Sequence, residues 1–266
     1  GLGLSGNAFE CKHCLEAITA DDFDENPFEK FTLNGGSEEM VKKMLEDIFV
    51  LGKLALLGQW TLFYSKPNVG KTLLIIWLLI ESIKQGFIKA KDIFYINADD
   101  SHKGLTFKLK LAENNGFNML APGYKGFKSD MLSPILQKLI ETDTASGKVV
   151  ILDTIKKFTD PMSKGESSEF GESLRQFVSH GGSVIALGHA NKHRGDDGKI
   201  IFAGTSDMPD DADCAYTLDV VTDDKFSGER VIKFDNFKNR GDVSLSASYE
   251  YNAAPNMSYE DRLGSV

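Results

Sequence analysis

Short apolar runs alternate with longer segments of helical periodicity through the middle of the chain. Four runs of mostly apolar residues are expected to be strands, at residues 60–64, 93–96, 149–152 and 183–187. Apolar runs without polar alternation indicate strands that are covered on both faces, as in a parallel sheet flanked by helices. The segments between them are expected to be helices, at residues 72–85, 101–115, 130–142 and 167–179. The pattern therefore predicts an α/β fold with a mostly parallel, twisted sheet.

The pattern changes in the last third of the chain. Three strand-like segments follow one another there, at residues 215–221, 229–237 and 243–251. Turn signals separate them at residues 226–228 and 239–241. We expect these segments to be C-terminal antiparallel strands that extend the parallel sheet.

The N-terminal end lacks sustained periodicity. Residues 1–27 are glycine-rich, then acidic, and are expected to be a flexible or truncated tail. Their cysteines, Cys11 and Cys14, have the spacing of half a zinc site, but no second half follows, so an exposed pair is the preferred interpretation. An amphipathic helix with Ser37 as its N-cap is expected over residues 37–49. The predicted organisation is this tail, one large domain over residues 28–254 and a C-terminal tail over residues 255–266.

Composition excludes several classes of protein. The chain has 266 residues, of which 41% are hydrophobic and 26% charged, as in ordinary globular proteins. Its longest apolar run, at residues 73–80, is far shorter than the roughly 20 residues that span a bilayer, so no membrane partner is expected. Three cysteines without a spaced framework favour a cytoplasmic location. A net charge of −9 excludes a protein that coats nucleic acid by bulk charge, although a locally basic loop stays open.

The strongest chemical signal is a phosphate-loop pattern between the first predicted strand and the first predicted helix. It matches GxxxxGK[ST] except at its first position, over Ser65, Lys66, Pro67, Asn68, Val69, Gly70, Lys71 and Thr72. Backbone N–H groups at a helix N-terminus bind phosphates, and Gly70 lets the backbone approach them closely. Lys71 is expected to reach the β- and γ-phosphates, and Thr72 to bind Mg²⁺. ATP and Mg²⁺ are therefore the expected cofactors.

Carboxylates close two of the other predicted strands. Asp153 follows the run 149–152, where a phosphate-loop enzyme places its Walker B acid beside Mg²⁺; the alternative is a cap of the following turn. Asp99 follows the run 93–96 and is expected to orient or deprotonate the attacking water. Asp100 is expected to cap the next helix or to support Asp99.

The order of these motifs resembles that of the RecA-type ATPases. Within them, the chain is most similar to the RepA-like and DnaB-like ring helicases and to the helicase half of phage and plasmid primase–helicases, over about residues 45–252. The resemblance implies a RecA-like fold, Mg-dependent ATP hydrolysis, and a hexameric ring or filament that moves on single-stranded DNA in replication or recombination. It also implies a primase, as a partner or as a fused module. The family usually has Glu where this chain has Asp99, and often Gly at the position of Ser65.

Three further residues take their expected roles from this resemblance. His189 matches a polar position that senses the γ-phosphate; the alternative is a strand-end histidine bonded to backbone. Lys238 and Arg240 lie in a turn that, in ring ATPases, reaches the γ-phosphate of the neighbouring subunit as an arginine finger. The alternative for them is an ordinary hairpin turn with solvated charges. RepA-like proteins commonly have an Arg where this chain has Ala203, so the finger has to come from Lys238 and Arg240.

The resemblance also implies two loops that line a central channel and hold the single-strand backbone. These loops cover residues 154–168 and 190–199, and mobile, solvated loops are the alternative interpretation. Their candidate cations are Lys156, Lys157, Lys164, Lys192, Arg194 and Lys199.

Three functions stay open at this point. The first is a ring-forming ATPase motor on single-stranded DNA, similar to a replicative helicase, which the motif order favours. The second is a KaiC-like or recombination-mediator nucleotide switch that acts on protein partners without unwinding, which the acidic net charge favours. The third is a module that holds nucleotide but hydrolyses little, since Ser65 and Asp99 depart from the family pattern.

Overall fold

The computed structural model describes residues 26, 28–29, 32–38, 47–160, 162–194, 200–202 and 207–266, with only the backbone at residues 191–194, 200–202 and 207. The chain divides into the units Gly1–Asp47 and Ile48–Val266. In the first unit, the cysteine pair and most of the predicted helix over residues 37–49 lie outside the described residues. Residues 37–38 are helical and residues 47–48 are not, so that helix does not reach residue 49.

The second unit is built on one nine-stranded sheet with the order β3-β2-β4-β5-β1-β7-β8-β9, and β6 pairs with β5 beside this path. Neighbours from β3 to β7 in this order run parallel. The strands β8, β9 and β6 run antiparallel to their partners. The bounds are β1 Trp60–Ser65, β2 Ile93–Asn97, β3 Asn118–Leu120, β4 Val149–Asp153, β5 Ser183–Arg194, β6 Ile200–Phe202, β7 Cys214–Asp223, β8 Glu229–Lys238 and β9 Ser246–Asn252.

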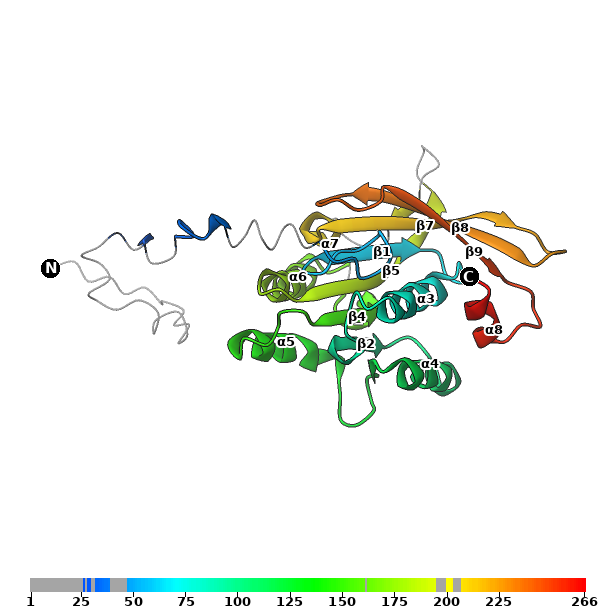
Figure 1. Ribbon diagram of the computed structural model, residues 1–266, viewed down its shortest axis with the longest axis horizontal. Coiled ribbons are helices and arrows are strands. Elements are labelled where there is room, and N and C mark those ends of the chain that lie inside the picture. Colours follow the sequence, from blue (N-terminus) through cyan, green and yellow to red (C-terminus); the bar gives the residue numbers. More distant parts are fainter. Residues whose placement is uncertain are drawn as a thin grey trace. The chain divides into compact units, whose positions relative to one another are not determined.

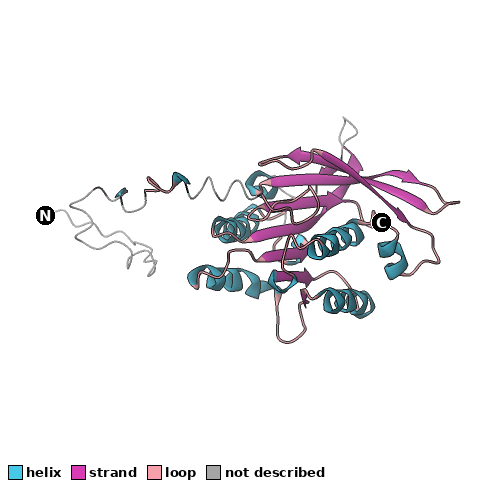
Figure 2. Cartoon of the chain, in the orientation of Figure 1, coloured by secondary structure: helices cyan, strands magenta, loops and turns pink. Residues whose placement is uncertain are grey.

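Helices cover both faces of this sheet (Figures 1 and 2). Figure 1 shows α3 and α4 on one face and α5 and α6 on the other. Short 3-10 turns at Ala90–Asp92, Ser129–Met131 and Ile155–Lys157 join strands to helices. The bounds of the helices are α3 Lys71–Lys84, α4 His102–Asn115, α5 Leu132–Glu141, α6 Lys164–Ser179, α7 Asp207–Asp211 and α8 Tyr259–Gly264. The α/β prediction, with a mostly parallel sheet and antiparallel C-terminal strands, is confirmed.

The core consists of two apolar layers, one on each face of the sheet. In β1, Leu62 and Tyr64 belong to the layer under α5 and α6, whereas Phe63 belongs to the layer under α3 and α4. Phe63 stacks on Tyr216 with ring centroids 5.3 Å apart. Because successive side chains of a strand point to opposite faces, burial on both faces produces apolar runs without alternation. This is why the strands were readable in the sequence.

The structure corrects several expected boundaries. The strand expected over residues 183–187 continues to Arg194, because its second half pairs with β6. The short helix α7, at Asp207–Asp211, lies between the expected strands, and the sequence pattern did not predict it. The last predicted strand begins at Ser246 rather than at residue 243.

The C-terminal segment carries a helix that the sequence pattern did not reveal. Residues 255–266 were expected to be a tail, but α8 begins with a capping box between Ser258 and Asp261. Its Leu263 is buried in the layer beside α3. The C-terminal helix therefore belongs to the packed unit. None of the helices in the described ranges combines the length and apolarity needed to cross a membrane.

Candidate functional site

The carboxyl ends of β1, β2, β4 and β5 meet at one edge of the sheet, because these strands are parallel. Their register places Ser65 beside His189 and Asn97 beside Asp153. A cavity of about 550 Å³ lies at this edge, and every residue of the loop 65–72 lines it. Open α/β sheets bind ligands at this edge, so the cavity is the candidate functional site.

The loop 65–72 leaves β1 and enters α3 through two residues with left-handed backbone. These are Asn68, with φ 62°, and Gly70, with φ 106°, which is the N-cap of α3. A Cβ on Gly70 would lie 2.5 Å from the Tyr251 hydroxyl, which donates a hydrogen bond to the Val69 carbonyl oxygen (3.2 Å). The position therefore requires glycine for its backbone and for its space. Ser65 does not have positive φ, so it needs no glycine.

Lys71 is the first residue of α3 and is almost completely buried. Its Nζ donates a hydrogen bond to the carbonyl oxygen of Gly188 (2.6 Å), in the neighbouring strand β5. Burial lowers the pKa of Lys71 to about 8, although the carboxylates of Asp153 and Asp99 oppose this shift. First-turn N–H groups of a helix lack intrahelical acceptors, so a buried cation and free N–H donors converge at this end of the cavity.

Asp153 is the buried end of β4, and three side chains surround its Oδ2 atom. The hydroxyl of Thr72 donates to it (3.0 Å), and the hydroxyl of Tyr95 on β2 donates to it (2.7 Å). The ammonium of Lys108 on α4 lies 3.5 Å away. Burial and the Asp153 carboxylate raise the pKa of Tyr95, so this hydroxyl stays a donor. Tyr95 and Lys108 thus hold the carboxylate against the beginning of α3.

Asp100 does not cap α4, contrary to one of the two roles expected for it. The N-cap of α4 is Ser101, which makes no side-chain cap bond. The Asp100 carboxylate instead lies 2.5 Å from the Nζ of Lys108 and accepts a hydrogen bond from Asn97 (2.8 Å). Lys108 therefore links Asp100 to Asp153. Nothing in the sequence pattern distinguished this buried lysine from the other lysines of α4.

Asp99 faces the cavity from the end of β2 and is 40% exposed. Its carboxylate lies 3.9 Å from the Nε2 of His189 and 3.9 Å from the Nζ of Lys156. Neither buried ring nitrogen of His189 has a hydrogen-bond partner among the described residues, so they offer no support for the alternative of a histidine bonded to backbone. Burial, Lys71 and Lys156 lower the pKa of His189, so its ring is neutral at pH 7.

Lys238 and Arg240 lie away from this cavity in their own chain. The register pairs Ala215 with Lys238 and places Cys214 beside Thr61, so this turn is at the amino ends of the parallel strands. The cavity is at their carboxyl ends. The structure therefore does not bring Lys238 and Arg240 together with the loop 65–72 within one chain.

The side chains of Lys238 and Arg240 also differ in their contacts within the chain. The Lys238 Nζ donates to the carbonyl oxygens of Pro209, at 2.7 Å, and of Asp210, which ties it to α7. The Arg240 guanidinium is 58% exposed and lies 3.7 Å from Asp213. Arg240 is the freer of the two for contact with another molecule.

Five of the six candidate cations for nucleic acid lie in regular secondary structure rather than in the expected loops. Lys156 and Lys157 lie in the 3-10 turn after β4, and Lys164 is the first residue of α6. Lys192 and Arg194 are on β5, which covers residues 190–194 of the expected loop, and their side chains are not described. Lys199 lies outside the described residues. Among the candidate cations whose side chains are described, Lys156 is the one placed beside the cavity, through Asp99.

The opposite wall of the cavity contains residues for which the sequence gave no signal. They come from α4, from the strands β8 and β9 and from α8, and they are Phe107, Lys108, Arg230, Tyr251, Tyr259 and Arg262. Arg230 donates from Nη1 to the Asn68 carbonyl oxygen (3.3 Å), which ties β8 to the loop. A single aromatic or basic residue in a strand or short helix has no pattern that marks it. Only the folding of distant segments onto the loop identifies these residues.

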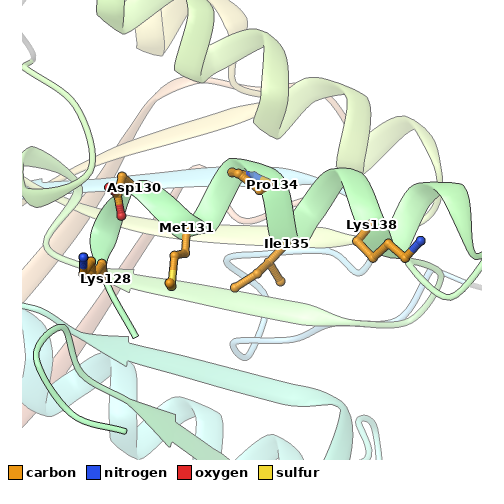
Figure 3. A pocket seen from close by; sticks show the side chains of 6 residues that line it. All are labelled: Lys128, Asp130, Met131, Pro134, Ile135 and Lys138. Carbon is orange, nitrogen blue, oxygen red and sulfur yellow. The ribbon is translucent and has the colours of Figure 1, made fainter. Parts of the chain in front are cut away.

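A second hollow of about 490 Å³ lies along α5 (Figure 3). Met131 and Ile135 lie on one side of the helix there, with Lys128 and Lys138 near the ends of the hollow. It contains none of the residues that the sequence motifs indicated. The convergent polar groups are at the loop 65–72, so that cavity is the candidate site.

No protein-family model matches the chain, and a comparison with curated proteins finds no match either.

Proposed function

We propose that this chain binds Mg-ATP in the cavity of the loop 65–72 and hydrolyses it, as an ATPase of the RecA class. The observation that carries the proposal is the hydrogen bond of 3.0 Å between Thr72 and Asp153. It places side by side the hydroxyl and the carboxylate that two separate motifs assign to Mg²⁺. The strand order supports the same class, since β5 lies between β1 and β4 and carries His189 between the loop and Asp153.

The chemistry of the donor set fits a nucleotide-bound magnesium ion. Among the residues with described positions, no group of three His, Cys, Asp or Glu side chains is placed to hold a metal. Mg²⁺ needs no such group, because it commonly takes one or two carboxylates and completes its shell with substrate phosphates and water. The oxygens of Thr72 and Asp153 are ligands of this type. When bound, the ion would neutralise charge that develops on the phosphates.

Other residues of the chain bind the phosphates, activate the attacking water and sense the γ-phosphate in this proposal. Lys71 exchanges its bond to the Gly188 carbonyl for the β- and γ-phosphates, and the N–H groups of the first turn of α3 hold the same phosphates. Asp99 accepts the proton of the attacking water, since it is the partly exposed carboxylate, whereas Asp100 is held by Lys108. His189, neutral and without a hydrogen-bond partner among the described residues, would respond to the γ-phosphate.

We extend the proposal to a ring or filament that acts on single-stranded DNA. In a head-to-tail assembly, Arg240 of one subunit, at the amino ends of its strands, reaches the cavity of the next subunit, at the carboxyl ends. The exposure of Arg240 supports this role, while Lys238, held on α7, positions the turn. Lys156 links the cavity to the turn that precedes α6, which gives hydrolysis a route to the candidate DNA-binding cations.

Calorimetric titration with ATP tests the nucleotide site. With Mg²⁺ present, we expect the chain to bind ATP, and Lys71→Ala to weaken binding at least on the order of 100-fold. The matched control is Lys84→Ala, because Lys84 is an exposed lysine at the other end of the same helix. Absence of binding, or equal binding by wild type and Lys71→Ala, would refute the proposal.

The motor function has a separate test. Steady-state ATP turnover is measured with and without single-stranded DNA over a range of protein concentrations, and the mass of the assembly is measured with Mg-ATP. We expect turnover to rise with DNA and with assembly. If the chain binds ATP but DNA does not stimulate ATP turnover, the motor function is refuted and the proposed nucleotide site stands.

A nucleotide switch that acts on a protein partner is the second candidate. The observation that favours it is the position of Lys156, whose ammonium lies 3.9 Å from the Asp99 carboxylate. Because Lys156 is paired with a carboxylate of the nucleotide site, it is less available to bind DNA. If the chain is a switch, its affinity for a protein partner should differ between the ATP-bound and ADP-bound states, and its ATP turnover should not respond to DNA.

A further inference from the structure

The helix α8 forms part of the wall of the cavity. It packs beside α3 at the carboxyl edge of the sheet (Figure 1). Leu263 of α8 is buried in the core, and the capping box between Ser258 and Asp261 fixes where the helix begins. Tyr259 and Arg262 are three positions apart on this helix, so they share one face, and both line the cavity with the loop 65–72.

Two polar atoms on this face are buried without a partner. They are the hydroxyl oxygen of Tyr259 and the Nε of Arg262, neither of which has a hydrogen-bond partner within the described parts of the chain. The rest of the Arg262 guanidinium is fixed, because Nη2 donates to the Ala254 carbonyl oxygen (3.0 Å). Buried polar groups in proteins are nearly always paired. Unpaired donors on side chains that line a cavity therefore indicate groups that a bound ligand completes.

The charges around this face favour a ligand that carries phosphate. Arg262 and Arg230 add two guanidinium groups to the cavity that already contains Lys71, although the Arg230 guanidinium is paired with the Asp223 carboxylate at 3.0 Å. Burial and the neighbouring Asp153 and Asp100 carboxylates raise the pKa of Tyr259, so its hydroxyl stays protonated and can donate. A hydroxyl donor and a fixed guanidinium on one helix face match the acceptor oxygens of a phosphate chain.

We infer that α8 is part of the nucleotide site, and that Tyr259 and Arg262 donate hydrogen bonds to the bound Mg-ATP. This inference rests on the function proposed above. Its consequence is that the affinity for nucleotide depends on the last eight residues of the chain. Binding in turn holds α8 on α3, because the ligand contacts both helices.

The test uses the full chain and calorimetric titration with Mg-ATP. We expect Tyr259→Phe and Arg262→Ala each to weaken binding about tenfold, as the loss of one hydrogen bond to a charged group does. Glu260→Gln is the matched control, since Glu260 is exposed on the same helix and should leave the affinity unchanged. Hydrogen exchange should show that Mg-ATP slows exchange of the α8 amides in wild type, and slows it less in the two variants.

Thermal unfolding without nucleotide separates a ligand role from a structural one. The Tyr259 hydroxyl has no partner in the described structure, so Tyr259→Phe should not lower the melting temperature of the ligand-free chain. A lower melting temperature with unchanged affinity would assign the hydroxyl to folding and overturn the inference.

The remaining outcomes are distinct from failure of the proposed function. If wild type binds Mg-ATP and Lys71→Ala does not, but both α8 variants bind like wild type, the inference is wrong and the proposed function stands. Tighter binding by the variants would mean that α8 competes with the ligand, which also overturns the inference. If wild type itself does not bind Mg-ATP, both proposals fail.

Discussion

The hydroxyl of Thr72 lies 3.0 Å from the Oδ2 of Asp153, and 81 positions of sequence separate the two residues. Thr72 is in the first turn of α3, and Asp153 is the last residue of β4. The hydroxyl of Tyr95 donates a hydrogen bond to the same oxygen, at 2.7 Å. The pair joins the loop that follows β1 to the end of a strand that is not its neighbour in the sheet.

Removal of either member of this pair should abolish the dependence of ATP binding on Mg²⁺. Thr72→Val keeps the shape of the side chain without its hydroxyl, and Asp153→Asn removes the charge. We expect turnover to fall at least on the order of 100-fold in both, because the oxygen ligands of the ion are lost. Thr72→Ser keeps the hydroxyl and is the control. Titrations with Mg²⁺ and with EDTA measure the effect, and Mg-dependent binding by Thr72→Val would contradict the assignment.

The protonation of Lys71 predicts a loss of affinity at alkaline pH. Burial lowers the pKa of Lys71 from 10.5 to about 8, so the free chain releases this proton as the pH rises past about 8. Phosphates bind the protonated form, so the dissociation constant for Mg-ATP should rise by up to about tenfold per pH unit above that value. Lys71→Arg stays charged over this range, and its dissociation constant should rise less steeply. Parallel pH profiles of the two proteins would disprove the explanation.

The same pKa shift affects the stability of the ligand-free chain with a defined sign. Between pH 8 and 10.5 the unfolded chain keeps the Lys71 proton that the folded chain releases. The free energy of unfolding therefore gains a contribution that rises with pH across this window. Urea unfolding of wild type and Lys71→Met at several pH values isolates this contribution, which should be absent in the variant.

Asp99 and Asp100 are neighbours in sequence, but their substitution should have different effects. Asp99→Asn should lower turnover by about 100-fold or more and leave the affinity for Mg-ATP unchanged, since a general base acts in the chemical step. Asp100→Asn should lower the free energy of unfolding by about 1–2 kcal/mol, because the buried Lys108 loses one of its two carboxylates. Steady-state kinetics and urea unfolding separate the two. Normal turnover in Asp99→Asn would remove it as the base.

A finger supplied by a neighbouring subunit predicts complementation between two inactive variants. Arg240→Ala and Lys71→Ala should each lose most turnover alone. In a mixture of equal parts, about a quarter of the interfaces join an intact cavity to an intact Arg240, and this fraction of the activity should return. The control is a mixture of Lys71→Ala with Lys138→Ala, whose lysine is exposed on α5. A mixture no more active than its components would exclude a role in trans.

The sequence pattern was most informative for strands whose side chains are buried on both faces of the sheet. The strands β1, β2 and β4 are covered on both faces, so their apolar runs marked them within one residue of their true ends. The extension of β5 to Arg194 was not readable, because its second half is polar and is defined by pairing with β6. The helix α8 was missed for a similar reason. It has six residues, too few to show a period, and Leu263 is its buried anchor.

Some residues of the candidate site could likewise be predicted from the sequence, and others could not. The loop 65–72 and Asp153 could be predicted, because contiguous residues or a strand end carry their signals. Lys108, Tyr259 and Arg262 could not, since Lys108 is one of several lysines in α4 and the other two are single residues in a helix too short to show a pattern. Their importance depends on which side chains lie within a few ångströms of the loop. A linear pattern does not contain that information.

The sequence by itself determined the alternation of strands and helices and the place of the loop at the junction of β1 and α3. Local hydrophobic periodicity and short motifs encode both, because they depend on neighbouring residues. Tertiary structure alone decided that Lys108 joins Asp100 to Asp153, that Arg240 lies at the edge away from the cavity, and that α8 closes its wall. These relationships arise because strand order and register bring together segments that are distant along the chain.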